Sequence, residues 1–257
     1  MSLWASSALA EQFEPFVFLM DALIFSVIFA AIAFALSLLA SRADKRIALT
    51  STALFAVYLG SDDLITGLPG ITRSLDFIPG SWNWTGKILS LVFAGIVVLV
   101  LRLSPDAIGF RKQEHQRTAW VAVMLFIVWG VCLGLLFKPG AADAETLAFQ
   151  ATMPGLAEEI AYRGIAPAIL LSLMNRKPHI DGIPWAVILV TSVIFGIWHS
   201  LTFSNGSVGF NLISGLFPFI GSVPGGWLRF KTKSLLTPIL GHSLANVAFH
   251  LAGTLAA

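Results

Sequence analysis

The chain has 257 residues, of which 56% are hydrophobic and only 12% are charged, and its formal net charge is +2 at pH 7. Soluble domains carry about a quarter charged residues, so this composition argues against a soluble enzyme, a disordered chain and a disulfide scaffold. Lys and Arg fall in short clusters between apolar runs and form no basic stripe, which argues against nucleic acid as a partner. We therefore expect a protein surrounded by membrane lipids.

Apolar runs of about the length that crosses the hydrocarbon layer recur along the whole chain. They predict an all-α fold, a polytopic membrane helix bundle of about eight transmembrane helices. Pro and Gly in the fifth and seventh runs leave open whether these two helices are continuous, broken or re-entrant. Without an internal repeat or a long linker, we expect a single transmembrane domain over residues 1–257, with the catalytic core in 146–257. The eight runs are 16–40, 47–60, 87–103, 119–137, 146–172, 184–203, 208–230 and 235–255.

Basic residues alternate between the successive connections that join these runs. Twelve of the 16 Lys and Arg residues fall on one side, and Arg73, Lys87 and Lys138 fall on the other. Because Lys and Arg concentrate in short cytoplasmic loops, the alternation predicts that both termini lie outside. Residues 1–15 lack the basic segment of a secretory signal, so the first run is expected to be a retained span. The expected location is the inner (plasma) membrane of a prokaryote.

Polar side chains inside predicted spans are costly in lipid, which makes them functional candidates. In MPGLAEEIAYRG, residues 153–164, Glu159 and Arg163 are four residues apart, in the order that favours an ion pair on a helix. Glu158 then has no cation left on its own helix and becomes the candidate general base. For Glu159 and Arg163, a purely structural ion cluster explains the pattern as well as a chemical role does.

Two later runs carry further polar groups. His199 lies near the end of the sixth run, and alone it is better explained as an interfacial histidine bonded to a neighbouring helix. His242, Asn246 and His250 recur every four residues and make one polar stripe on the eighth run. Such a stripe is expected to face the interior of the bundle, where His250 could simply be a core histidine. A GxxxG pattern at Gly130 and Gly134 weakly indicates close helix packing.

These groups suit the hydrolysis of a peptide bond. A carboxylate and an imidazole can bind and deprotonate a water, and neutral His and Asn can donate hydrogen bonds to an oxyanion. No GxSxG motif lies near the histidines, which disfavours a serine nucleophile. HExxH is also absent. Glu158, His199 and His242 could still form a zinc site with water as the fourth ligand, so a metal-dependent mechanism stays open.

Three motifs occur in order, each on a predicted span: Glu-Glu-x-x-x-Arg at 158–163, Phe-x-x-x-His at 195–199 and His-x-x-x-Asn at 242–246. The ordered set resembles the signature motifs of the CPBP family, which includes the CAAX prenyl endopeptidases and the Abi proteins linked to bacteriocin self-immunity. The resemblance implies an intramembrane endopeptidase that cuts near the C-terminus of a membrane-anchored or lipidated protein. The metal-free glutamate mechanism is the preferred one, with zinc as the alternative. The resemblance implies that Glu158 and His199 activate water, that His242 and Asn246 stabilise the oxyanion, and that Glu159 and Arg163 support the site.

Other classes of protein fit part of the pattern. A proton-coupled transporter also buries carboxylates and histidines, but it usually has two similar halves, and no repeat is visible here. A non-catalytic scaffold or bacteriocin-immunity protein on the same fold is disfavoured by the complete motif set. The predicted topology puts His199 near the outer end of its span and His242 nearer the inner end. The side from which the site opens is therefore left undecided, with a weak bias towards the outside.

Overall fold

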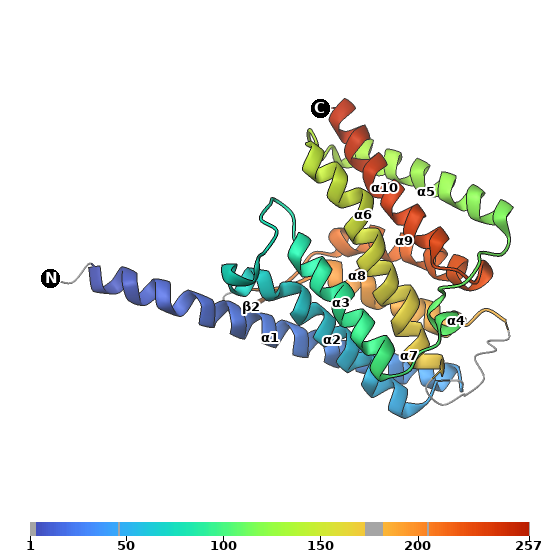
Figure 1. Ribbon diagram of the computed structural model, residues 1–257, viewed down its shortest axis with the longest axis horizontal. Helices are drawn as coiled ribbons and strands as arrows, with labels where there is room; N and C mark the ends of the chain where they lie inside the picture. The colour runs from blue at the N-terminus through green and yellow to red at the C-terminus, as the bar shows by residue number, and fades with distance from the viewer. Residues whose placement is uncertain (1–3, 46, 173–181, 205, 257) are drawn as a thin grey trace.

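The computed structural model describes residues 4–45, 47–172, 182–204 and 206–256. Figure 1 shows these residues as a helical bundle with one small hairpin. The elements are α1 (Trp4–Ala43), α2 (Leu49–Ile71), η1 (Arg73–Leu75), α3 (Trp84–Val100), α4 (Pro105–Ile108), α5 (Gln116–Phe137), α6 (Ala144–Glu159), η2 (Ile160–Ile165), α7 (Ala166–Ser172), α8 (Trp185–Ser200), β1 (Leu201–Ser204), β2 (Ser207–Phe210), α9 (Leu212–Lys231) and α10 (Leu236–Leu255).

A long helical segment lies at each of the eight predicted runs, so the all-α prediction is confirmed. Two stretches, Val17–Ala43 and Gln116–Phe137, are long and apolar enough to cross a membrane, while α3 and α8 are apolar but shorter. Only 22% and 17% of the most apolar windows of these two stretches are buried inside the bundle, unlike the core helix of a soluble protein. Their exposed apolar side chains fit a lipid environment. That all eight segments cross the membrane stays a prediction.

The fifth and seventh helices, for which breaks were considered, are both unbroken. Pro154 lies inside α6, and Pro218 and Pro224 lie inside α9, yet both helices continue past them. The helical path of α6 runs through one π-helical turn, η2, directly into α7. Such turns are rare and often lie at functional sites; this one begins directly after Glu159.

The hairpin is the element that the sequence did not predict. β1 pairs with β2 in antiparallel register, from Leu201↔Phe210 to Ser204↔Ser207. The sixth run was expected to continue as a helix to residue 203, but α8 ends at Ser200. His199 therefore lies in the last turn of a short helix.

Helix α2 is also longer than predicted. It runs to Ile71 and not to residue 60, because apolar residues resume after Asp62 and Asp63. At the start of α3, the Asn83 side chain accepts a hydrogen bond from the backbone N–H of Gly86 and caps the helix. Asp62 and Asp63, which lie beyond the predicted second run, are inside α2. Lys87, the first residue of the third run, was counted with the preceding connection, and the structure places it inside α3.

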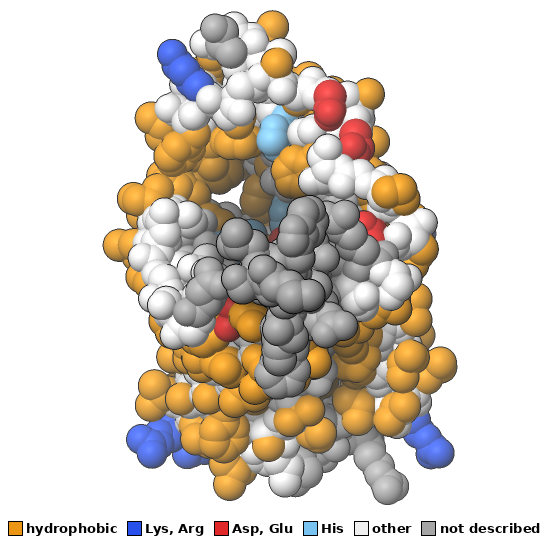
Figure 2. Space-filling model, turned by 90° about the vertical axis from the view of Figure 1, so that its left-hand side faces the viewer, with side chains coloured by type: hydrophobic (Ala, Val, Ile, Leu, Met, Phe, Trp, Pro, Cys, Tyr) orange, Lys and Arg blue, Asp and Glu red, His pale blue; other side chains and the backbone are white. Residues whose placement is uncertain are grey.

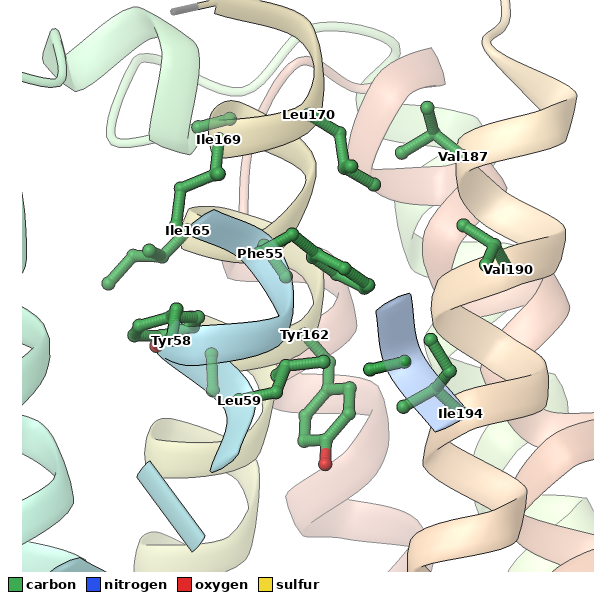
Figure 3. Close-up of a cluster of buried hydrophobic side chains, with 14 of the residues drawn as sticks. Phe55, Tyr58, Leu59, Tyr162, Ile165, Ile169, Leu170, Val187, Val190 and Ile194 are labelled. Atoms are coloured by element: carbon green, nitrogen blue, oxygen red, sulfur yellow. The ribbon is translucent and has the colours of Figure 1, made fainter. Parts of the chain in front are cut away.

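The apolar core joins α2, η2–α7 and α8, as Figure 3 shows. Phe55, Ile165 and Ile194 are fully enclosed there.

Helices α5 and α10 pack closely against each other. A Cβ added at Gly130 or Gly134 would collide with the backbone of α10, so the close packing predicted from the GxxxG pattern is confirmed.

The connections gather at two ends of the bundle, visible at the left and right of Figure 1. At the first, which we call the hairpin end, connections 72–83 and 138–143 join the β1–β2 hairpin. There Ser81 N donates to Glu145 Oε1 and Ala142 N to Thr254 Oγ1. At the second, which we call the basic end, connections 101–115 and 232–235 meet, and Glu114 N donates to the carbonyl of Thr232.

Candidate active site

Glu158 lies at the centre of the candidate site, in the last turn of α6, and is 7% exposed. Its Oε1 accepts a hydrogen bond from Nζ of Lys87 on α3 at 2.7 Å. Its Oε2 lies 3.9 Å from Nε2 of His199 and 3.9 Å from Nε2 of His242. These separations are too long for direct hydrogen bonds, but a water beside the atoms could reach the oxygen and a nitrogen at hydrogen-bond distance. No cation on its own helix pairs with Glu158, as expected, but Lys87 of a different helix supplies one, which the sequence analysis did not predict.

The two histidines meet at Glu158 although the predicted depths of their spans differed. His199 terminates α8, whose chain then leaves the helix as β1, while His242 lies in the second turn of α10. The His199 ring packs edge-on against Phe195 at 4.7 Å and Trp198 at 4.9 Å between ring centroids. The early end of α8 therefore holds His199 at the depth of Glu158.

Glu159 and Arg163 form the predicted ion pair. Glu159 Oε1 lies 3.1 Å from Nη1 of Arg163, and the two residues are 2% and 4% exposed. The same oxygen lies 2.8 Å from Nδ1 of His242. The Arg163 guanidinium stacks over Phe195, with its carbon 4.5 Å from the ring centroid. Glu159 thus links the first motif to the third.

This link decides which nitrogen of His242 carries a hydrogen. An ionised carboxylate can only accept, so Nδ1 must donate to Glu159. In the neutral ring Nε2 then has no hydrogen, and it becomes a donor only in the imidazolium form. The expectation that a neutral His242 donates to an oxyanion is inconsistent with this hydrogen bond.

The rest of the polar stripe on α10 divides in two. Asn246 lines the same cavity as His242 and donates from Nδ2 to Oε1 of Gln150 at 2.9 Å. His250 is not among the described residues that line this cavity, and its ring packs edge-on against Trp82 and Phe249. His250 therefore lies outside the candidate site.

A polar cluster behind Glu158 was missed by the sequence analysis. The Lys87 ammonium lies 5.1 Å from the ring centroid of Trp198, whose indole N–H donates to Asp63 Oδ1 at 2.7 Å. Asp62 accepts from Ser90 Oγ at 2.7 Å. These residues surround a cavity of about 10 Å³, enough for about one water. The apolar residues that follow Asp63 were the signal that could have extended α2 and revealed the cluster.

The motif side chains open into a cavity of about 700 Å³. This volume lies within the usual range for small-ligand and peptide pockets. Eight aromatic residues line its walls, and the charged side chains gather around Glu158. Figure 2 shows a hollow on the face of the molecule, with histidine side chains visible within it. The aromatic lining residues are Trp82, Phe126, Trp129, Phe149, Phe195, Trp198, Phe217 and Phe249.

Glu158, His199 and His242, the candidate zinc ligands, are not positioned to bind a zinc ion in this structure. Across the described ranges, no group of three or more His, Cys, Asp or Glu side chains is arranged to hold a metal. Ligands at zinc distances in a tetrahedron lie about 3.4 Å apart, whereas Glu158 Oε2 lies 3.9 Å from each histidine nitrogen. The Lys87 ammonium on Oε1 would also repel a dication.

One family model matches the chain over residues 142–248, that of the Rce1-like type II CAAX prenyl endopeptidases. The matched range contains all three motifs and extends from the end of the 138–143 connection into α10. No curated protein and no solved structure matches the chain. The family is one of membrane-integral proteases, which agrees with the apolar helices of this chain. The part of the chain that carries the candidate site, residues 142–248, is therefore similar to the CAAX prenyl endopeptidase family.

Proposed function

We propose that this protein is an intramembrane endopeptidase that hydrolyses a peptide bond near the C-terminus of a membrane-anchored or lipidated protein. The observation that carries the proposal is the end of the cavity at Glu158. There one carboxylate oxygen faces two imidazole nitrogens, each at 3.9 Å, in a pocket with apolar walls. A water beside these atoms could hydrogen-bond to the carboxylate oxygen and to an imidazole nitrogen, and the apolar walls suit a lipidated or apolar peptide segment.

In the proposed mechanism, Glu158 Oε2 and His199 Nε2 hold the water, and Glu158 takes one of its protons. The resulting hydroxide attacks the carbon of the scissile carbonyl. The proton then passes to the leaving amine as the carbon–nitrogen bond breaks. The hydrogen bond from Lys87 to Oε1 supports the ionised form of Glu158 before the attack. No metal takes part in any of these steps.

His242 and Asn246 are the proposed donors to the oxyanion. Because Nδ1 of His242 is bonded to Glu159, the ring can donate from Nε2 only as an imidazolium. In the proposed step His242 acts in that form, with Glu159 at 2.8 Å from Nδ1 and Glu158 at 3.9 Å from Nε2. Asn246 supplies the second donor by exchanging its bond to Gln150 for one to the substrate.

The test is cleavage by the purified full-length protein of farnesylated, acylated and tail-anchored peptides, with the cut located by mass spectrometry. Glu158→Gln should lower turnover about 100-fold to 10,000-fold. The matched control is Glu114→Gln at the basic end, which should keep full turnover. Retained turnover in Glu158→Gln would overturn the mechanism, and a wild-type protein that cuts none of these peptides would favour a scaffold. Loss of activity with a chelator, restored by zinc, would replace the metal-free mechanism with a metalloprotease.

A further inference from the structure

The mouth of the 700 Å³ cavity is built from the hairpin end of the bundle. Trp82 and Asn83 come from connection 72–83, and Leu201 and Thr202 come from β1. Among the described residues that line the cavity, none comes from connections 101–115 or 232–235 at the basic end. The cavity therefore has access to one end of the bundle.

The helical residues that line the cavity also come mainly from the halves of their helices that lie nearer the hairpin end. α5 contributes Trp129 and Leu133 from the half that leads to connection 138–143, and α6 contributes Phe149 from its first turns after the same connection. His199 lies in the last turn of α8, next to β1. The hollow in Figure 2 opens on the side of the molecule that lies at the left of Figure 1, which is the hairpin end. The cavity thus runs from Glu158 towards the hairpin end.

Tight packing closes the opposite direction. Ile108 of α4 and Leu235 are 4% and 1% exposed. A Cβ added at Gly164, in the π turn beyond Glu158, would lie 3.0 Å from Leu235 Cδ1 and 3.2 Å from the carbonyl oxygen of Ile108. Leu235 N also donates to the carbonyl of Gly109. Between the site and the basic end, these residues leave no space for a peptide.

The distribution of Lys and Arg indicates which end of the bundle faces the cytoplasm. Of the thirteen Lys and Arg residues that the structure describes, only Arg73 and Lys138 lie at the hairpin end, and Lys87 and Arg163 are in the site. Since basic residues concentrate on the cytoplasmic side, the basic end faces the cytoplasm. The other nine are at or near the basic end: Arg42, Lys45, Arg102, Arg111, Lys112, Arg117, Arg229, Lys231 and Lys233.

We infer that the site is entered from the extracytoplasmic side, and that its substrates are membrane-anchored proteins whose scissile bond is presented on that side. The apolar segment next to the scissile bond occupies the aromatic-lined cavity, while the bond itself reaches Glu158. The assignment of a proteolytic substrate rests on the proposed function. The direction of entry rests on the cavity and the charges alone.

Cysteine accessibility in intact cells tests the direction. The single cysteine is first removed with Cys132→Ser, and single cysteines are then added to the full chain by Thr202→Cys or Asn83→Cys at the mouth. Lys112→Cys and Arg117→Cys are matched controls, exposed at the basic end. A membrane-impermeant maleimide should label both mouth variants in spheroplasts, and should label both controls only in inverted vesicles.

The opposite pattern, with the mouth variants labelled only in inverted vesicles, would overturn the inference and place the cavity on the cytoplasmic side. Two independent mouth positions keep the test valid if one variant fails to fold. Labelling does not require turnover, so its failure is separate from a failure of the Glu158→Gln test. Outside labelling together with no cleavage of any of the peptides by the wild-type protein would keep the direction and refute the proposed function.

Discussion

The substitution Lys87→Met tests the ion pair that the sequence analysis missed. The ammonium and the Glu158 carboxylate are 2.7 Å apart, and their side chains are only 10% and 9% exposed. At that distance the gross Coulomb attraction is about 6 kcal/mol at an effective dielectric constant of 20. Desolvation offsets much of it, but removing one partner of a buried pair leaves the other charge uncompensated, at a cost of about 3–5 kcal/mol.

We therefore expect Lys87→Met to lower the free energy of unfolding by about 3–5 kcal/mol. Turnover should fall on the order of 100-fold, because Oε2 of Glu158 is no longer held towards the two histidines. KM should change little, since Lys87 binds the Glu158 carboxylate and the substitution leaves the aromatic walls of the cavity in place. Lys87→Arg keeps the charge and should recover part of both losses.

The measurements are unfolding in mixed micelles and kcat and KM on a peptide that the wild-type protein cuts. A double-mutant cycle with Glu158→Gln isolates the pair, and the two stability losses should be less than additive by about 1–3 kcal/mol. Lys112→Met at the basic end is the control for the loss of a lysine. Wild-type stability together with wild-type kcat in Lys87→Met would refute the reasoning.

Three other substitutions test separate parts of the structure. Glu159→Gln should lower kcat by as much as about 10,000-fold with little change in KM, because an amide can donate to Nδ1 of His242 and impose the wrong tautomer; an unchanged kcat would refute the role of this link. Arg163→Ala should lower the free energy of unfolding by about 3 kcal/mol, because Glu159 loses its cation, and an unchanged melting temperature would contradict the pairing. Gly130→Ala should destabilise the protein by separating α5 from α10, whereas Gly95→Ala, at a position with no atom within 4 Å of the added Cβ, should be neutral or stabilising; equal effects on the melting temperature would argue against close packing at Gly130.

Local chemistry explains why much of the fold could be predicted. Each helix has to satisfy its own backbone in a bilayer, so the apolar runs mark the helices without reference to their neighbours. The i,i+4 spacing of Glu159 and Arg163 and the four-residue spacing of His242 and Asn246 also depend only on helix geometry. Both patterns appear in the structure as predicted.

Interactions between helices account for what was missed. Lys87 and Glu158 are separated by 71 residues, and no spacing rule relates them. Asp62 and Asp63 ended the second run on hydropathy grounds, but they are held inside α2 by Ser90 and Trp198 of other helices. A charged residue that is satisfied by a distant partner resembles a loop residue in the sequence.

Local patterns along the chain were enough to predict the helical class, the order of the three motifs and the residues from which a hydrolytic site could be built. The packing of the helices against one another fixed which of these groups meet. It placed Lys87 on Glu158, oriented His242 through Glu159, and ended α8 early enough to bring His199 to the same depth. The physical reason is that hydropathy and spacing act along one helix, whereas the pairing of buried charges is decided by the helices that enclose them.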